Sequence, residues 1–180
     1  MKITLLVLKL LLLLYLGYLL SFLATGYEPE MPGYRPPILI FIVDTINLYI
    51  HEAGHFFLKP FGRFIEVLGG SFFQCFIPLL LVLVSWRQNV KSVPYGMFWF
   101  GENFINVSAY IRDAPYKHLK LISKTCIHDW NWLLSDHLDT AEPLGTIVFF
   151  LGLLLCFVAI GLGVYVTLRS YSEPAVTMTE

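Results

Sequence analysis

Long apolar runs constrain this chain more than any other feature of its sequence. A helix that crosses the hydrocarbon core of a bilayer needs about 20 apolar residues. Five stretches reach or approach that length: residues 3–24, 38–58, 67–86, 93–111 and 144–168. The runs are continuous rather than alternating, which argues against a closed β-barrel. We therefore predict an all-α polytopic membrane helix bundle of about five transmembrane helices, with residues 1–169 as one domain and 170–180 as a polar tail.

Composition supports a protein that lies in a lipid bilayer. Hydrophobic residues make up 57% of the 180 residues and charged residues 14%, whereas soluble domains carry about 25% charged residues. An apolar surplus of this size does not fit inside a soluble protein of this length. The net charge of −1 provides no basic face for nucleic acid. The three cysteines are too far apart for a Cys-x-x-Cys metal site or a disulfide framework.

The first apolar run, residues 3–24, has the basic start and apolar core of a signal peptide. Its length and the poor cleavage sequence that follows it, Ala24-Thr25-Gly26, favour a retained helix instead. With five crossings and a cytoplasmic N-terminus, eight Lys and Arg residues fall on the cytoplasmic side and four on the other. Because positive residues concentrate in cytoplasmic loops, we expect the N-terminus inside and the C-terminus outside.

The run 38–58 contains the segment His51-Glu52-Ala53-Gly54-His55, which has the pattern H-E-x-x-H. Residues i and i+4 share one face of a helix, so the two histidines can hold one Zn²⁺ ion, and Glu52 can act as general base on a water that the zinc activates. Each ionisable residue at the centre of a membrane helix costs about 2.5–3.5 kcal/mol, so three together require compensation. The alternative is a polar contact between helices that holds no metal.

A catalytic zinc site needs a third protein ligand and an open position. Two predicted crossings, 67–86 and 93–111, separate His55 from Ile127, so the end of the motif helix and the loop after Ile127 lie on the same side of the membrane. Glu102, near the middle of its predicted helix, could also reach the site. The residues alone leave six candidates: Glu102, Asp113, His128, Asp129, His137 and Asp139.

Polar side chains recur on one face of the motif helix. Asp44, Asn47, His51 and His55 are spaced by 3, 4 and 4 residues, so they form a single stripe. Asp44 or Asn47 could accept the ring N–H of a ligand histidine. Asp44 could instead lie near the lipid headgroups at the start of the helix.

A second polar stripe follows in the run 93–111 and just beyond it. On this stripe Asn106 could orient a substrate carbonyl or stabilise an oxyanion, or it could hydrogen-bond between helices. The small residues 69–71 allow two helices to approach closely, and Gln74 could form a hydrogen bond across the bundle. The members of the second stripe are Glu102, Asn106, Tyr110 and Asp113.

The H-E-A-G-H motif within a membrane helix resembles the site-2 protease family of intramembrane zinc metalloproteases, in which an aspartate on a later helix is the third ligand. The chain is more similar still to small bacterial membrane proteins placed near those peptidases. That similarity spans about half the chain, from Asn47 to Leu134, with F-G-R-F-I-E-V-L-G-G-S-F-F-Q (61–74), N-V-S-A-Y-I-R-D-A (106–114) and H-D-W-N-W-L-L (128–134).

The resemblance implies Asp129 as the third ligand, with His128 as second choice, and a location in the bacterial plasma membrane. The aspartate of site-2 proteases lies in a Leu-Asp-Gly context after an Asn and a Pro, whereas this chain has Leu138-Asp139-Thr140. The expected function is a membrane-embedded zinc metalloprotease that cleaves a transmembrane protein substrate. The alternatives are a regulatory or partner-binding zinc protein without proteolysis, and a metal transporter, which the unbroken apolar runs 79–84 and 151–158 disfavour.

Overall fold

The computed structural model describes residues 2–122 and 126–172, and every regular element in these ranges is a helix. The all-α prediction is therefore confirmed. The short elements are η1 (Lys59–Phe61), η2 (Val90–Ser92), α5 (Asp129–Leu133) and η3 (Leu138–Thr140). The long helices are α1 (Lys2–Thr25), α2 (Ile38–Leu58), α3 (Arg63–Gln88), α4 (Val93–Arg112) and α6 (Ala141–Ser172).

Within the described residues, three helices are long and apolar enough to cross a membrane. They are Ile3–Thr25 of α1, Arg63–Gln88 of α3, and Leu138–Ser172, which covers η3 and α6. At most 33% of the apolar window in any of them is buried inside the protein, so most of each apolar surface faces outward. These helices fit an integral membrane protein. The helices α2 and α4 carry the polar stripes and are not among these three.

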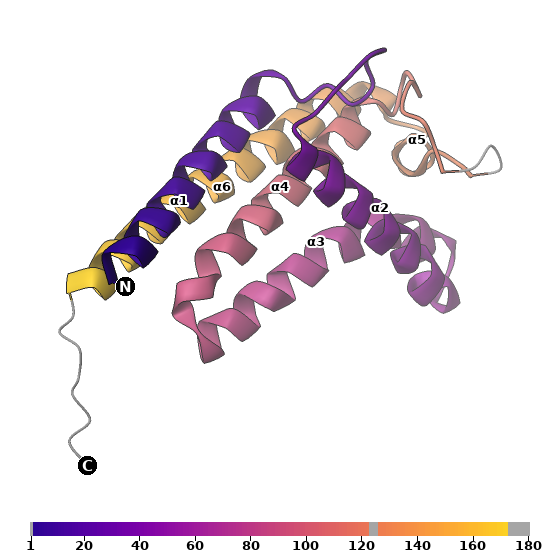
Figure 1. The fold of residues 1–180 in the computed structure, drawn as a ribbon. Coiled ribbons are helices and arrows are strands. Elements are labelled where there is room, and N and C mark those ends of the chain that lie inside the picture. The colour runs from indigo at the N-terminus through magenta and orange to yellow at the C-terminus, as the bar shows by residue number, and fades with distance from the viewer. Residues whose placement is uncertain (1, 123–125, 173–180) are drawn as a thin grey trace.

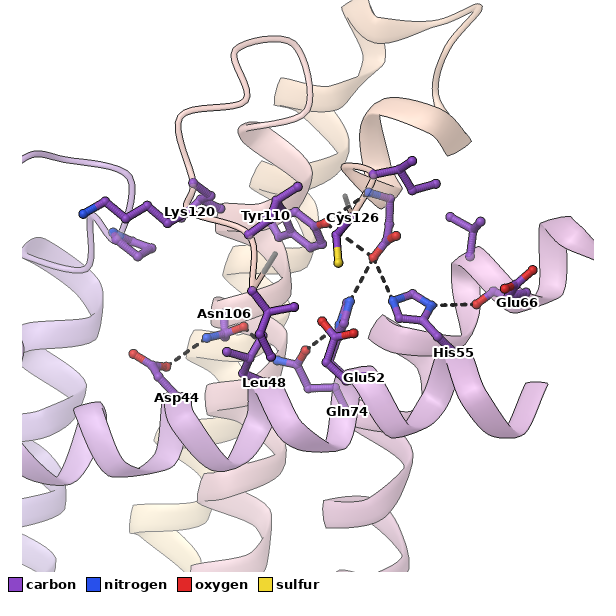
Figure 2. Close-up of a pocket in the computed structure, with 18 of the residues that line it drawn as sticks. Asp44, Leu48, Glu52, His55, Glu66, Gln74, Asn106, Tyr110, Lys120 and Cys126 are labelled. Atoms are coloured by element: carbon purple, nitrogen blue, oxygen red, sulfur yellow. Dashed lines mark hydrogen bonds and ion pairs between the residues drawn. The ribbon is translucent and has the colours of Figure 1, made fainter. Parts of the chain in front are cut away.

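The helix α2 differs from the other long helices in direction. α1, α3, α4 and α6 run along one common direction, and α2 crosses one end of the group (Figures 1 and 2). The short helix α5 lies at that same end, whereas η2 connects α3 to α4 at the opposite end. The elements that carry the H-E-x-x-H motif and Asp129 are therefore gathered at one end of the bundle.

This arrangement changes the expected topology. Five crossings would place the two ends of the chain on opposite sides. In the structure, the start of α1 lies beside the end of α6 (Figure 1). The two segments expected to cross between His55 and Ile127 form α3 and α4, and of these two helices only α3 is among the three that are apolar enough to span a membrane. Most of the predicted polar tail, residues 173–180, lies outside the described residues, and residues 170–172 complete α6.

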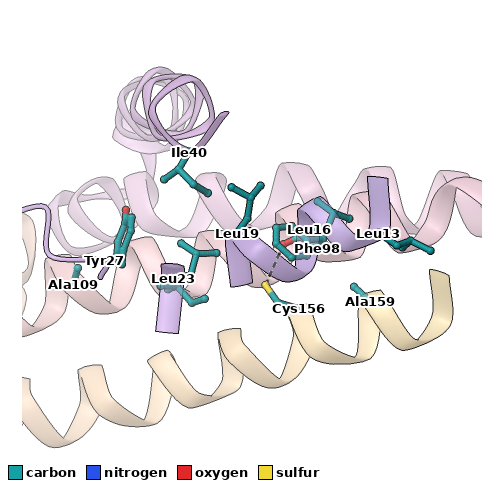
Figure 3. Close-up of a cluster of buried hydrophobic side chains, with 11 residues drawn as sticks. Leu13, Leu16, Leu19, Leu23, Tyr27, Ile40, Phe98, Ala109, Cys156 and Ala159 are labelled. Atoms are coloured by element: carbon teal, nitrogen blue, oxygen red, sulfur yellow. Dashed lines mark hydrogen bonds between the residues drawn. The ribbon is translucent and has the colours of Figure 1, made fainter. Parts of the chain in front are cut away.

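Glycines bring α4 and α6 into close contact. A Cβ on Gly101 would lie 2.8 Å from the backbone nitrogen of Cys156, and a Cβ on Gly152 would lie 2.7 Å from the carbonyl oxygen of Gly101. Such contacts matter in a membrane because dispersion forces, and not apolar burial, drive helix association there. Leucines of α1 spaced three or four residues apart cover this pair and form the core around Phe98 (Figure 3): Leu13, Leu16, Leu19 and Leu23.

Alanine substitution at two glycines of α6 tests this contact. Gly152→Ala should lower the free energy of unfolding by about 1–3 kcal/mol, because the methyl group overlaps the α4 backbone. Gly161→Ala is the matched control, since a Cβ there meets nothing within 4 Å, and alanine is favoured over glycine in a helix by about 0.5–1 kcal/mol. Thermal unfolding in detergent, followed by circular dichroism, measures both. Equal shifts in the two variants would contradict the packing assigned to Gly152.

Candidate metal centre

Three side chains from two elements converge at the end of the bundle. Nε2 of His51 lies 2.8 Å from Oδ2 of Asp129, and Nε2 of His55 lies 3.2 Å from the same oxygen (Figure 2). The ligand atoms of the three residues all lie within 4.8 Å of one another. Two imidazole nitrogens and one carboxylate oxygen can hold a divalent metal ion, and this donor set suits zinc. The structure thus brings together the three residues that we expected as ligands.

The remaining ring nitrogens of both histidines face hydrogen-bond acceptors. Nδ1 of His55 lies 2.8 Å from the backbone carbonyl oxygen of Glu66, and Nδ1 of His51 lies 3.2 Å from Oε1 of Gln74. Each Nδ1 therefore faces an acceptor to which it can donate, and each Nε2 faces the carboxylate of Asp129. This is the usual way in which a ligand histidine is oriented.

Asp129 is ionised at neutral pH, as a metal ligand must be. Burial favours a higher pKa for its carboxyl group, but hydrogen bonds from His51 and His55 outweigh burial and lower the pKa to about 2. The hydroxyl of Tyr110 accepts a hydrogen bond from the backbone N–H of Asp129 at 3.0 Å and donates to Oδ2 at 3.4 Å. The carboxylate is thus held from both sides before any metal binds.

His128 has a structural position next to Asp129. It is the N-cap residue of α5, and its Nδ1 accepts a hydrogen bond from the backbone N–H of Asn131 at 3.2 Å. Its Nε2 donates to Oδ2 of Asp113, 3.1 Å away. Burial lowers the pKa of His128, although Asp113 favours a higher value, so the ring is neutral. Both nitrogens are already engaged, and His128 lies outside the group that could hold a metal.

The other residues of the H-D-W-N segment hold α5 in place. The indole N–H of Trp130 donates to Oγ of Ser71 on α3 at 3.0 Å, and the side-chain amide of Asn131 donates to the carbonyl oxygen of Ala114 at 2.9 Å. The guanidinium group of Arg63 lies 5.8 Å from the ring of Trp132. These contacts tie α5 to α3 and to the end of α4, so Asp129 is presented by a fixed element.

Glycines determine how closely α2 approaches α3. A Cβ on Gly69 would lie 2.9 Å from the carbonyl oxygen of Gly54, and a Cβ on Gly54 would overlap the carbonyl group of Gly69. The ring of His51 lies directly over Gly70, where a Cβ would meet Cε1 of the ring at 2.6 Å. Gly54, inside the motif, and residues 69–71 therefore form the crossing that was expected from their small size.

The candidate ligands line a cavity of about 450 Å³ (Figure 2). Glu52 lines the same cavity, half-buried, on the helix that supplies both histidines. The apolar part of the lining includes Leu48, Val67 and Ile127. The arrangement leaves room for water beside the candidate ligands.

The other residues expected near the site occupy different positions. Glu102 is almost fully buried deeper in the bundle, where Oε2 accepts from the side chain of Asn47 at 2.8 Å. His137 and Asp139 are exposed near η3. Glu102, His137 and Asp139 all lie outside the group that could hold a metal.

Three contacts of the site were not assigned from the sequence. The contact between His55 and the backbone carbonyl of Glu66 could not be predicted from the sequence, because every residue has a backbone carbonyl. Tyr110 was visible only as a member of the second polar stripe, without a role. Gln74 was expected to bond across the bundle, but the ring N–H of His51 was expected to meet Asp44 or Asn47.

Substitution at Gly70 should remove the metal site without unfolding the bundle. A methyl group in Gly70→Ala overlaps the His51 ring and must push it away from Asp129, so zinc affinity should fall by about 10- to 100-fold. Gly17→Ala on α1 is the control, since a Cβ there meets nothing within 4 Å. Zinc per chain, measured by elemental analysis after dialysis, distinguishes them. Full zinc content in Gly70→Ala would refute the position given to His51.

Comparison of the chain with protein-family models, with curated proteins and with solved structures finds no significant match. The interpretation of the site therefore depends on its own geometry. That geometry comprises two histidines and an aspartate around one point, a nearby carboxylate, and a cavity at one end of a helical bundle.

Proposed function

We propose that this chain is a membrane-embedded zinc metalloprotease that hydrolyses a peptide bond of a transmembrane protein in or near the bilayer of a bacterial plasma membrane. The observation that carries the proposal is the convergence of His51, His55 and Asp129 beside a cavity that Glu52 also lines. Three protein ligands leave one position open, as catalytic zinc sites do. The cytoplasmic location of the N-terminus stays a prediction.

The residues of the site have separate roles in the proposed reaction. His51, His55 and Asp129 would hold the zinc, which lowers the pKa of water to about 7 and polarises a carbonyl group. Glu52 accepts a proton from the attacking water and delivers it to the leaving amine. Tyr110 keeps Asp129 in position through two hydrogen bonds.

The surroundings of the site suit a substrate that comes from the membrane. Around the end of α2 and the start of α3, Phe56, Phe57, Phe61 and Phe64 each expose more than half of their surface. A transmembrane substrate can rest against such an apolar surface next to the cavity. Because the carbonyl groups of a helix are hydrogen-bonded, the segment must unwind before attack, so helix-breaking residues are expected near the cut.

Metal content and peptide cleavage together test the proposal. Wild type and Glu52→Gln should each retain about one zinc per chain, because Glu52 is not a ligand, whereas His51→Ala should lose it. Synthetic transmembrane peptides with a central Gly-Pro pair, reconstituted with each protein in liposomes, are analysed by mass spectrometry. Glu52→Gln should cleave about 10²- to 10⁴-fold more slowly than wild type.

The outcomes separate the alternatives. Wild-type protein that binds no zinc after loading would contradict the metal site. Zinc binding with no cleavage by wild type would instead favour a zinc-binding protein without proteolysis. Movement of zinc across the liposome membrane, blocked by His51→Ala, would favour a transporter.

A further inference from the structure

Gln74 connects the candidate metal centre to a second polar group that lines the same cavity (Figure 2). Its Oε1 lies 3.2 Å from Nδ1 of His51, and its Nε2 donates to Oδ1 of Asn106 at 2.7 Å. Nδ2 of Asn106 donates to Oδ1 of Asp44 at 2.8 Å and to the hydroxyl of Tyr27 at 2.7 Å. These side chains form one continuous hydrogen-bond chain across α2, α3 and α4. Every donor in this hydrogen-bond chain points towards Asp44.

The direction of this chain decides which nitrogen of His51 faces the metal. An amide accepts at its oxygen and donates at its nitrogen. In the observed orientation Oε1 of Gln74 can accept a proton from Nδ1, and Nε2, 2.8 Å from Oδ2 of Asp129, is then the nitrogen that a metal would take. If Gln74 turned over, its N–H would donate to Nδ1. The neutral ring would then carry its proton on Nε2, where it could not bind a metal.

Asp44 fixes the direction of this hydrogen-bond chain. Its Oδ1 accepts from two donors, the side-chain amide of Asn106 and the hydroxyl of Tyr27, which is 2.9 Å away. Asn106 must therefore turn its nitrogen to Asp44 and its oxygen to Gln74, and Gln74 must turn its oxygen to His51. Gln74 is only 3% exposed, although it lines the cavity, and its amide has a partner at each end, Nδ1 of His51 and Oδ1 of Asn106.

The two ligand histidines differ in this respect. Nδ1 of His55 donates to the carbonyl oxygen of Glu66, which belongs to the backbone and accepts in any orientation of the side chains. Nδ1 of His51 depends on a side chain that can turn over. Of the two histidines, only His51 therefore needs a partner side chain whose orientation is fixed by other residues.

We propose that Gln74 is a positioning residue that holds His51 in the tautomer able to bind a metal, and that Asn106 and Asp44 set the orientation of Gln74. This inference rests on the metal site proposed above. Asn106 donates both amide protons within the chain, to Asp44 and to Tyr27, so it acts on the site through Gln74 and not as a donor to substrate.

Two variants of Gln74 and a neighbouring control test the inference. Gln74→Leu should weaken zinc binding by about 10- to 100-fold, as expected for loss of a partner that orients a ligand. Gln74→Glu should weaken zinc binding less than Gln74→Leu, because one carboxylate oxygen still accepts from Nδ1 of His51, although the other loses the hydrogen bond to Oδ1 of Asn106. Cys75→Ala, at the next and half-buried position of α3, should match wild type. Affinities are measured for the full chain in detergent by competition with a chromophoric zinc chelator.

Nuclear magnetic resonance of ¹⁵N-labelled histidine gives the readout that a general loss of packing would not reproduce. In the zinc-free protein the two ring nitrogens of His51 face rival acceptors, Gln74 and Asp129. The His51 signal, identified by its loss in His51→Gln, should therefore show a larger share of Nδ1 protonation in wild type and in Gln74→Glu than in Gln74→Leu. Asp44→Asn, which touches no ligand, should also show a smaller share than wild type, because asparagine at this position allows Asn106 to turn over.

Unchanged zinc affinity and an unchanged Nδ1 proton in Gln74→Leu would overturn the inference. Equal weakening in Gln74→Leu and Gln74→Glu would also overturn it, because the acceptor would then not be the relevant property. The tautomer is measured without zinc as well as with it. If wild type binds no zinc, the metal site fails, whereas the role of Gln74 towards His51 is still decided by the Nδ1 proton.

Discussion

The close crossing of α2 over α3 is the contact on which the position of every candidate ligand depends. Gly54 and Gly69 let the two backbones touch, and Gly70 leaves room for the ring of His51. On α3, Glu66, Gly70 and Gln74 follow one another at intervals of four residues, so they lie on one face. The carbonyl of Glu66 meets His55, and Gln74 meets His51. Three successive turns of α3 thus support both histidines.

The same face of α3 also helps to place the third ligand. Ser71, next to Gly70, accepts the hydrogen bond of Trp130, and Trp130 follows Asp129 directly in α5. A shift of α3 by one turn would therefore move the supports of the histidines and the support of the carboxylate together. This coupling explains how a helix of five residues can hold a ligand at a definite position: its own hydrogen bonds are few, but its contacts reach α3 and α4.

Two features of the sequence made part of the structure predictable: the length of its apolar runs and the spacing of the motif residues. Long apolar runs predicted the helices, and the i, i+4 spacing placed His51 and His55 on one face. The direction of α2 was not predictable, because composition does not record how a helix lies relative to its neighbours. For the same reason the partner of His51 was sought in Asp44 or Asn47, on its own helix, whereas packing presents Gln74 from α3. Asp129 was chosen over the other candidates by resemblance and not by residue chemistry.

The side chains of His51 and His55 also differ in how far they are exposed, and this difference shows which side of the site is more open. The side chain of His51 is 7% exposed and that of His55 is 22% exposed. The buried histidine is held by a chain of side chains that continues into the bundle, and the more exposed one by a backbone carbonyl near the cavity. Glu52 lies on the cavity side as well. His55 and Glu52 therefore form the more open side of the site, and the side chains that support His51 line another part of the same cavity.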